Sequence, residues 1–190
     1  MKIRLLKFNN VKSTNDIAIK LIKSNKFCPT IISSRKQFKG RGTMGKNWVS
    51  KNGNLFFSIF FQINAKKINF KQFAILNALI LKKIVSKFIT KKIQIKWPND
   101  LIYQRKKFCG ILQEVIHLNK KDFLIIGVGL NTNVNPKNKS FLSTSLKDIS
   151  HKKIDNEKVL KSIKESYEIL LKKIKQLSFL ELKKYIIDLK

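Results

Sequence analysis

The sequence contains few cysteines and no long apolar run. Cys28 and Cys109 are its only cysteines, far apart in the chain and without the spacing of a metal site. This usage predicts reduced thiols in a cytoplasmic protein rather than a disulfide scaffold. No window approaches the roughly 18 consecutive apolar residues of a membrane span. Residues 1–15 start basic but lack the apolar core of a secretory signal. We therefore expect a cytoplasmic protein with no membrane segment and no metal site of its own.

Acidic residues and arginines are also scarce. The chain has 41 Lys and Arg against 11 Asp and Glu, a formal charge of +30. One interpretation is a nucleic-acid-binding protein. The other is a coding bias toward Lys, Ile, Asn and Phe, which we favour because the lysines are spread along the whole chain. Proteins that contact nucleic acids use more arginine, whose fork matches phosphate and guanine. The charge still attracts acidic partners over long range. The arginines are Arg4, Arg35, Arg41 and Arg105.

The 190 residues, 43% hydrophobic, are enough for one sizeable domain. Apolar runs predict strands, and helical periodicity after N-cap candidates predicts helices. Strands are expected at 3–8, 30–33, 55–63, 93–97, 101–103, 108–116 and 123–128, and helices after 13–16 and at 70–88, 156–174 and 179–189. This order predicts an α+β or mixed α/β domain, in which a mixed sheet packs against helices. The polar break at 135–139 is expected to be only a loop, which leaves a single domain over residues 1–190.

A polar, glycine-rich segment at 35–54 is expected to be a long loop, and long loops inside compact domains tend to be functional. Its glycines allow backbone N–H groups to approach an anion, and Arg41 could bind a carboxylate or phosphate with two bonds. A solvated surface loop is the alternative, and the spacing of a Walker A loop is missing. The core of the segment reads Gly40-Arg41-Gly42-Thr43-Met44-Gly45-Lys46-Asn47-Trp48.

Two further segments combine turns, small residues and charge. Lys96-Trp97-Pro98-Asn99-Asp100 ends a predicted strand with a turn. Lys107, at the end of a basic turn at 105–107, is expected to follow on the next strand, near Asn99 and Asp100. A lysine facing a cavity could stabilise charge on phosphorus or carbonyl oxygens, although most lysines in this chain are solvated. In Gly127-Val128-Gly129-Leu130-Asn131 the alternating glycines would let another group pack against the strand. A bulged strand is the alternative.

Together these segments resemble the catalytic domain of biotin–protein ligases, in order and in spacing. That family shows Ser-Thr-Asn near the start, then the arginine-rich glycine loop ending in Trp, Lys-Trp-Pro-Asn-Asp, Lys-x-x-Gly-Ile-Leu-x-Glu and Gly-x-Gly-x-Asn. The resemblance covers about residues 3–175. The Lys-Trp-Pro-Asn-Asp segment separates biotin ligases from the related lipoate ligases. The matching segments here are Ser13-Thr14-Asn15, 40–48, 96–100, Lys107 to Glu114 and 127–131.

The resemblance implies a fold like that of class II aminoacyl-tRNA synthetases and a two-step, ATP-dependent reaction with Mg²⁺. Biotin and ATP would form biotinyl-5′-AMP and diphosphate, and a lysine of a biotin carboxyl carrier protein, a subunit of acetyl-CoA carboxylase, would then take the biotin. No protein nucleophile is needed, so positioning and cations would carry catalysis.

The resemblance also assigns residues to roles. The catalytic group would be Lys107, Arg41 and Asp100, with Asp100 orienting the incoming lysine. The biotin site would consist of Ser13, Thr14, Asn15, Gln37, Gly40, Arg41, Gly42, Thr43, Lys107 and Gly110. The ATP site would consist of Arg41, Trp48, Lys96, Asn99, Lys107 and Asn131, with Trp48 covering the bound ligand.

The chain departs from the family pattern at several points. Thr43 and Lys46 stand where the family has loop arginines. We expect neither the N-terminal helix-turn-helix domain of regulatory members nor the small C-terminal β-barrel, and hence no repressor function and no specific DNA partner. A lipoate or octanoate transferase, a basic nucleic-acid-binding protein and an inactive ligase remain alternatives. The sequence does not indicate the carrier, the oligomeric state or the turnover rate.

Overall fold

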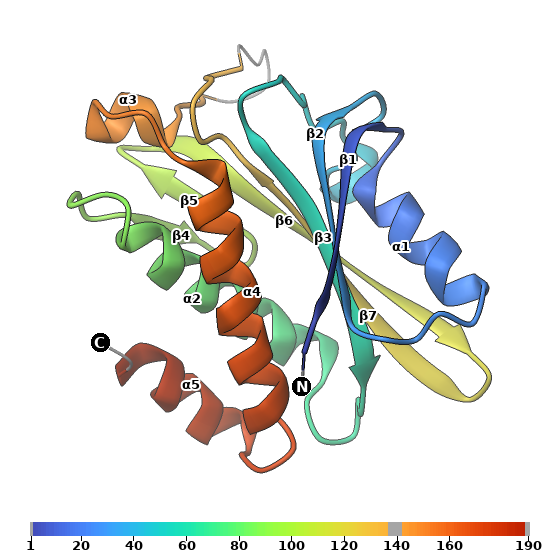
Figure 1. Ribbon diagram of the computed structural model, residues 1–190. Coiled ribbons are helices and arrows are strands. Elements are labelled where there is room, and N and C mark those ends of the chain that lie inside the picture. Colours follow the sequence, from blue (N-terminus) through green and yellow to red (C-terminus); the bar gives the residue numbers. More distant parts are fainter. Residues whose placement is uncertain (1, 137–141, 189–190) are drawn as a thin grey trace.

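A computed structural model describes residues 2–136 and 142–188, and it contains one mixed sheet with helices on both faces (Figure 1). The predicted mixed sheet packed against helices is therefore confirmed. The elements in chain order are β1 (Arg4–Val11), α1 (Thr14–Lys23), β2 (Thr30–Gln37), the 3₁₀ turn η1 (Thr43–Gly45), β3 (Leu55–Ile63), α2 (Phe70–Ser86), β4 (Gln94–Lys96), β5 (Asp100–Tyr103), β6 (Lys106–Leu118), β7 (Lys121–Leu130), α3 (Leu146–Ser150), α4 (Asn156–Lys173) and α5 (Phe179–Asp188).

The sheet has seven strands in the order β1-β2-β3-β7-β6-β5-β4. Only β1 and β2 are parallel, and α1 crosses between them; the other neighbouring pairs are antiparallel. Two turns of two residues each join β5 to β6 and β6 to β7. Positive φ angles at Gln104 and Arg105, and at Asn119 and Lys120, suit tight hairpin turns, whose twist matches that of the strands.

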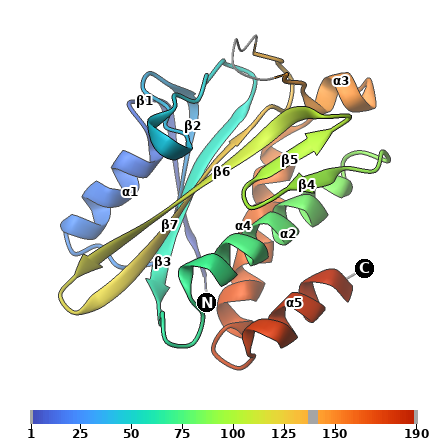
Figure 2. The ribbon, with the colours of Figure 1, turned by 180° about the vertical axis from the view of Figure 1, so that it is seen from behind.

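The two faces of the sheet are covered differently, as Figures 1 and 2 show from opposite sides. Helices α2, α4 and α5 lie over one face and close the large core, which includes Phe57, Phe73 and Tyr167. On the other face α1 covers only a smaller cluster that includes Ala18, Ile22 and Phe60. Part of this second face is therefore left for loops and a pocket.

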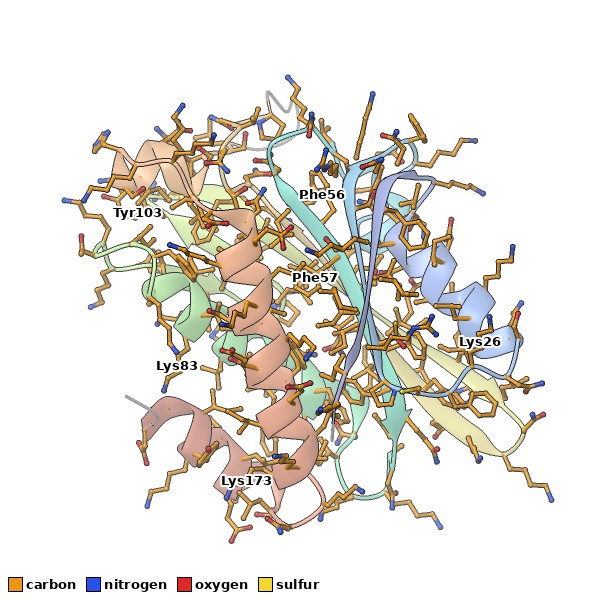
Figure 3. All side chains as sticks on the ribbon, viewed as in Figure 1. Lys26, Phe56, Phe57, Lys83, Tyr103 and Lys173 are labelled. Atoms are coloured by element: carbon orange, nitrogen blue, oxygen red, sulfur yellow. The ribbon has the colours of Figure 1, made fainter. Side chains whose placement is uncertain are left out.

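Alternation along β3 sends neighbouring phenylalanines to opposite faces. Phe57 belongs to the large core, whereas Phe56, also fully buried, points to the face that carries α1. Figure 3 labels both residues and also shows lysine tips projecting from well-separated parts of the outline, among them Lys26, Lys83 and Lys173. The lysines therefore do not gather at one place in this view.

Several predicted boundaries are wrong. The expected loop at 35–54 begins later, because β2 continues beside β1 as far as the pair Val11↔Gln37. The basic turn expected at 105–107 consists instead of Gln104 and Arg105, and Lys107 is the second residue of β6, the strand on which it was expected to follow. The short helix α3 was not predicted. The expected break at 135–139 and the expected end of the last helix at residue 189 fall partly outside the described residues.

Candidate active site

A pocket lies on the face of the sheet that carries α1, above three adjacent strands. Residues directly opposite one another in paired strands share a face, so β3, β7 and β6 place small side chains in rows. The floor rows are Ser58–Gly127–Leu112 and Phe56–Gly129–Gly110. The N-terminal end of α1 stands over the first row, and the loop that follows β2 stands over the second.

The three floor glycines are required by close packing. A Cβ at Gly127 would collide with the side-chain amide of Asn15, and one at Gly129 would collide with the ring of Trp48. A Cβ at Gly110 would lie 2.7 Å from the Trp48 ring and 3.1 Å from Nζ of Lys107. Gly110, Gly127 and Gly129 are therefore positions where other groups reach the backbone, as the sequence predicted for Gly127 and Gly129.

The end of the pocket beside α1 is polar. Ser13 is the N-cap of α1, although its side chain makes no capping bond. Gln37 Oε1 accepts a hydrogen bond of 2.8 Å from the backbone N–H of Thr14, and its Nε2 donates to Ser50 Oγ at 3.0 Å. Asn15 is buried beside Gly127. Hydroxyl and amide groups thus converge at one end of the pocket.

The other end of the pocket carries a lysine. The Nζ of Lys107 lies 2.7 Å from Oδ1 of Asp100, and both side chains are less than one-fifth exposed. The same Nζ lies 5.2 Å from the centre of a Trp48 ring. Bonds from Lys107 N to Leu142 O and from Thr144 N to Lys107 O hold this part of β6. The pair is a cation at the pocket edge with a counter-ion behind it.

A β-bulge puts Lys107 on the pocket face. Leu101 pairs with Cys109, but the next residue, Ile102, pairs with Lys107, so β6 has one residue more than β5 at Phe108. In a regular strand Lys107 would share the face of Cys109, two residues further on, and would point into the large core, because side chains alternate along a strand. The bulge is thus the feature that makes the lysine available to the pocket.

The loop over the pocket is a small hairpin. Arg41 bridges to Asn47, Trp48 N donates to Gly40 O at 2.8 Å, and Gly42 N donates to Lys46 O at 2.7 Å. Gly40 itself is buried at the base, where a Cβ would lie 2.6 Å from Trp48 O. The hairpin therefore positions Trp48 over the floor.

Trp48 covers the glycine part of the pocket floor. Its ring lies directly on Gly110 and Gly129. Its buried Nε1 has no hydrogen-bond partner within residues 2–136 and 142–188. A buried unsatisfied donor costs about 1–3 kcal/mol, so polar bonding does not hold the indole in this place.

Arg41 lines the pocket, and its guanidinium is held by two carboxylates. Its guanidinium forms two bonds with Glu114, of 2.9 and 2.8 Å, and also lies 3.1 Å from Asp16. The two carboxylates thus occupy the fork that could have bound an anion. Glu114 and Asp16 were not among the predicted site residues; the only sequence signal was the glutamate that ends the Lys107 to Glu114 segment.

Most predicted site residues line one pocket, but four do not. The pocket is lined by Ser13, Thr14, Asn15, Gln37, Arg41, Gly42, Thr43, Trp48, Asn99, Lys107 and Gly110, together with the unpredicted Ile111, Leu112, Gly127, Val128 and Gly129. Lys96 lies exposed on the edge strand β4. Asn131 is buried outside the lining, where its amide donates to Thr144 O at 3.2 Å. Asp100 and Gly40 stand behind the lining.

Cys28 and Cys109 are free, and burial raises the pKa of the Cys109 thiol. Across residues 2–136 and 142–188 there is no group of three His, Cys, Asp or Glu side chains placed to hold a metal ion. No helix in those residues combines the length and apolarity that crossing a membrane requires.

Comparison with known proteins gives a consistent family match. The model of the biotin/lipoate A/B protein ligase family matches residues 8–131. The "Bifunctional ligase/repressor BirA" of Bacillus spizizenii is 30% identical over 159 residues, 80% of this chain and 49% of that protein. The "Biotin--[acetyl-CoA-carboxylase] ligase" of Paracoccus denitrificans is 31% identical over 104 residues, 54% of this chain and 43% of that protein. The chain thus spans about half the length of these curated relatives.

A solved structure extends the match to nearly the whole chain. The biotin protein ligase from Aquifex aeolicus in complex with biotin and ATP superposes with a TM-score of 0.80 at 32% identity, covering 96% of this chain and 76% of that one.

Proposed function

Since the chain belongs to the biotin/lipoate A/B protein ligase family, we propose that it is an ATP-dependent biotin–protein ligase. It joins biotin to the α-phosphate of ATP, forming biotinyl-5′-AMP and diphosphate. It then transfers biotin to a lysine of a biotin carboxyl carrier protein and releases AMP. The similarity to the Aquifex ligase, whose structure contains biotin and ATP, supports the substrates. The name of the Paracoccus relative supports the carrier.

The observation that carries the proposal is the polarity of the pocket. One end presents the hydroxyl and amide groups of Thr14, Asn15 and Gln37, and the other presents Lys107, with a glycine floor between them. Gly127 and Gly129 are about 7 Å apart along β7. A ligand with a polar head, an apolar middle and a carboxylate suits this order, and biotin has those parts.

In this proposal Ser13, Thr14, Asn15 and Gln37 bind the ureido ring, because buried polar groups must find hydrogen-bond partners. Gly110, Gly127 and Gly129 let the rings approach the sheet. Gly42 and Thr43 contact the ligand from the loop. Pre-formed polar groups of this kind orient a ligand at little cost in conformational entropy.

Lys107 supplies the positive charge at the reacting centre. The biotin carboxylate oxygen attacks the α-phosphorus, the bond to the bridging oxygen breaks, and diphosphate leaves. Negative charge grows on the phosphate oxygens, where a pre-placed cation lowers the barrier. Asp100 holds Lys107 in place. In the second step the carrier amine attacks the mixed anhydride carbonyl, loses a proton, and AMP leaves.

Arg41 and Trp48 act in the loop that covers the pocket. With its fork bound by Glu114 and Asp16, Arg41 holds the loop rather than a phosphate. Trp48 leaves the glycine floor when biotin enters, because its ring already lies against Gly110 and Gly129, where the ligand rings would pack. It then covers the ligand and excludes water, which would otherwise hydrolyse the adenylate. Asn99 lines the pocket and contacts the nucleotide. We propose no direct contact between the nucleotide and Lys96 or Asn131, which lie outside the pocket lining.

Mg²⁺ is proposed to enter with ATP, held by phosphate oxygens and water. The described residues offer no cluster of acidic or histidine ligands, which fits an ion carried by the nucleotide rather than by a protein cage. The two free cysteines fit a reducing, cytoplasmic location.

The test is ATP–diphosphate exchange with biotin, with lipoate and without either acid. Biotin-dependent exchange is expected, followed by transfer of radiolabelled biotin to a carrier domain. Exchange that depends on lipoate alone would assign the chain to the lipoate branch of the family. If a folded sample shows no exchange with biotin and none with lipoate, the proposed ligase function is refuted.

A further inference from the structure

The carboxylate of Glu114 connects the pocket loop to the polar end of the pocket. It accepts the two bonds from Arg41 described above and a third, of 2.6 Å, from Nδ2 of Asn15. Asp16 supports Arg41 from the other side at 3.1 Å. Glu114 therefore joins a residue of the covering loop to a residue of α1.

Glu114 lies just outside the pocket it could influence. It is on β6 opposite Ile125, one row beyond the floor row that contains Leu112 and Gly127, and it does not belong to the pocket lining. Its side chain is 25% exposed. A ligand in the pocket would touch Asn15 and Arg41 but not Glu114, so any effect of Glu114 on binding must pass through those two residues.

The carboxylate also decides which way the Asn15 amide faces. An ionised carboxylate only accepts hydrogen bonds, so the NH₂ group of Asn15 must face Glu114, and Oδ1 must face Ser58. Ser58 is fully buried on the floor, and its Oγ is within bonding distance of both Asn15 Oδ1 and Thr14 Oγ1. A hydroxyl has one hydrogen, and an amide oxygen cannot supply one, so the Ser58 hydrogen goes to Asn15.

The order of hydrogens then continues to Thr14. The 2.7 Å contact between Ser58 Oγ and Thr14 Oγ1 must be bridged by the hydrogen of Thr14. The Thr14 hydroxyl then has no hydrogen left to donate to Gln37 Oε1, which lies 3.1 Å away. Gln37 Oε1 still accepts a hydrogen bond from the backbone N–H of Thr14. Thr14 Oγ1 is thereby left as an acceptor for a ligand N–H.

We propose that Glu114 is a positioning residue, which sets the hydrogen-bond direction through Asn15, Ser58 and Thr14 and clamps Arg41, so that the pocket accepts the ureido N–H groups of biotin. This inference rests on the proposed biotin ligase function and adds a specificity role for a residue outside the pocket. Exposed ion pairs contribute little to stability, so the role is expected in ligand binding rather than in folding.

The test compares Glu114→Gln with Glu114→Asp in biotin-dependent ATP–diphosphate exchange. Glutamine keeps the shape but can offer its NH₂ to Asn15 Oδ1, which allows the order of hydrogens to reverse, and it cannot pair twice with Arg41. We expect KM for biotin to rise at least about tenfold, the equivalent of 1.4 kcal/mol, with KM for ATP, kcat and the melting temperature nearly unchanged. The aspartate carboxylate, like that of glutamate, only accepts hydrogen bonds. The KM for biotin of Glu114→Asp should therefore lie closer to wild type than that of Glu114→Gln.

Two controls separate this role from others. Glu157→Gln removes the exposed ion pair of 2.5 Å with Lys7. Neither residue lines the pocket, so this variant should behave as wild type. In the background of Asn15→Ala, Glu114→Gln should add little to the rise in KM for biotin, because residues acting in one network are not additive.

The outcomes are distinct. Wild-type protein without biotin-dependent exchange would overturn the proposed function, and this inference with it. Active wild type together with an unchanged KM for biotin in Glu114→Gln would overturn only the inference. The inference also fails if Glu114→Gln impairs KM for biotin, KM for ATP and kcat equally and lowers the melting temperature. It fails as well if the effects of Glu114→Gln and Asn15→Ala are fully additive.

Discussion

Nζ of Lys107 lies 2.7 Å from Oδ1 of Asp100, and this ion pair depends on the bulge at Phe108. Asp100 is opposite Gly110 and so shares its face of the sheet. The extra residue in β6 turns Lys107 toward that same face. A lysine held against a carboxylate at the pocket edge is pre-placed for developing negative charge.

Replacing Lys107 with alanine should reduce biotinyl-AMP formation by about 10²–10³-fold, the usual effect of removing one pre-placed donor. The measurement is biotin-dependent ATP–diphosphate exchange, with circular dichroism to check the fold. Lys106→Ala is the matched control, because Lys106 is the exposed neighbour on the same strand. Comparable exchange in both variants would make Lys107 one more surface lysine.

Biotin should displace Trp48 from the glycine floor and change its fluorescence. The chain has two tryptophans, and Trp97 is 54% exposed in the turn between β4 and β5. The emission change on biotin titration should persist in Trp97→Phe and vanish in Trp48→Phe. If Trp97→Phe binds biotin with no spectral change, the indole does not move.

Thr43→Arg should slow release of the biotinyl-AMP intermediate by roughly tenfold or more. Thr43 lines the pocket from the exposed loop but has no charge. A charged hydrogen bond is worth about 1.5–3 kcal/mol, and about 1.4 kcal/mol is tenfold. Intermediate dissociation and labelling of a bystander protein measure the effect; wild type should label the bystander more. Equal release rates would mean that other contacts, such as those of Lys39 or Lys46, close the loop.

Tyr167→Phe should destabilise the fold by about 1–2 kcal/mol without changing the pocket. The hydroxyl of fully buried Tyr167 donates to Asn77 Oδ1 at 3.0 Å between α4 and α2, and burial raises its pKa. Its loss leaves a buried acceptor with one partner fewer. The melting temperature should fall by about 2–8 °C, and Tyr103→Phe, at a half-buried tyrosine, serves as the control. An unaltered melting point would show that water replaces the hydroxyl.

Glu168 should make stability depend on pH in the acid range. Hydrogen bonds from Lys164, at 2.8 Å, and from the backbone N–H of Ile3, at 2.7 Å, hold the pKa of this carboxyl below its usual range. A lowered folded-state pKa means that the stabilisation is present above the usual value of about 4.3 and is lost as pH falls through the lowered one.

Urea midpoints of wild type and Glu168→Gln should therefore differ at about pH 7 and converge toward about pH 3. The difference is of the order of 1 kcal/mol, since the side chain is partly exposed. A constant difference across this range would mean that the charge of Glu168 is irrelevant.

Much of the fold and of the site residue types could be predicted from local sequence. The apolar run 55–63 is a strand with the predicted bounds, because a strand buried on both faces needs apolar residues at nearly every position. Gly127 and Gly129 were predicted as places of close approach, and a Cβ at either does collide with another side chain. These features depend on residue type and on near neighbours in the chain.

The assembly of the site could not be predicted in the same way. That Gly127 lies between Ser58 and Leu112 depends on the register of three strands, and a slip of one residue would turn every side chain to the other face. That Arg41 is bound by Glu114, 73 positions away, depends on the same register and on where the loop packs.

The sequence by itself determined which residues carry charge, flexibility and hydrogen-bonding groups, since those are properties of single residues and their neighbours. The tertiary structure alone decided that Lys107 faces the pocket, because the bulge at Phe108 arises from pairing with β5. It also decided that Lys96 and Asn131 stay out of the pocket lining. The face of the sheet toward which a side chain points, and its distance from the pocket, result from contacts between segments far apart in the chain. No local pattern of residues encodes them.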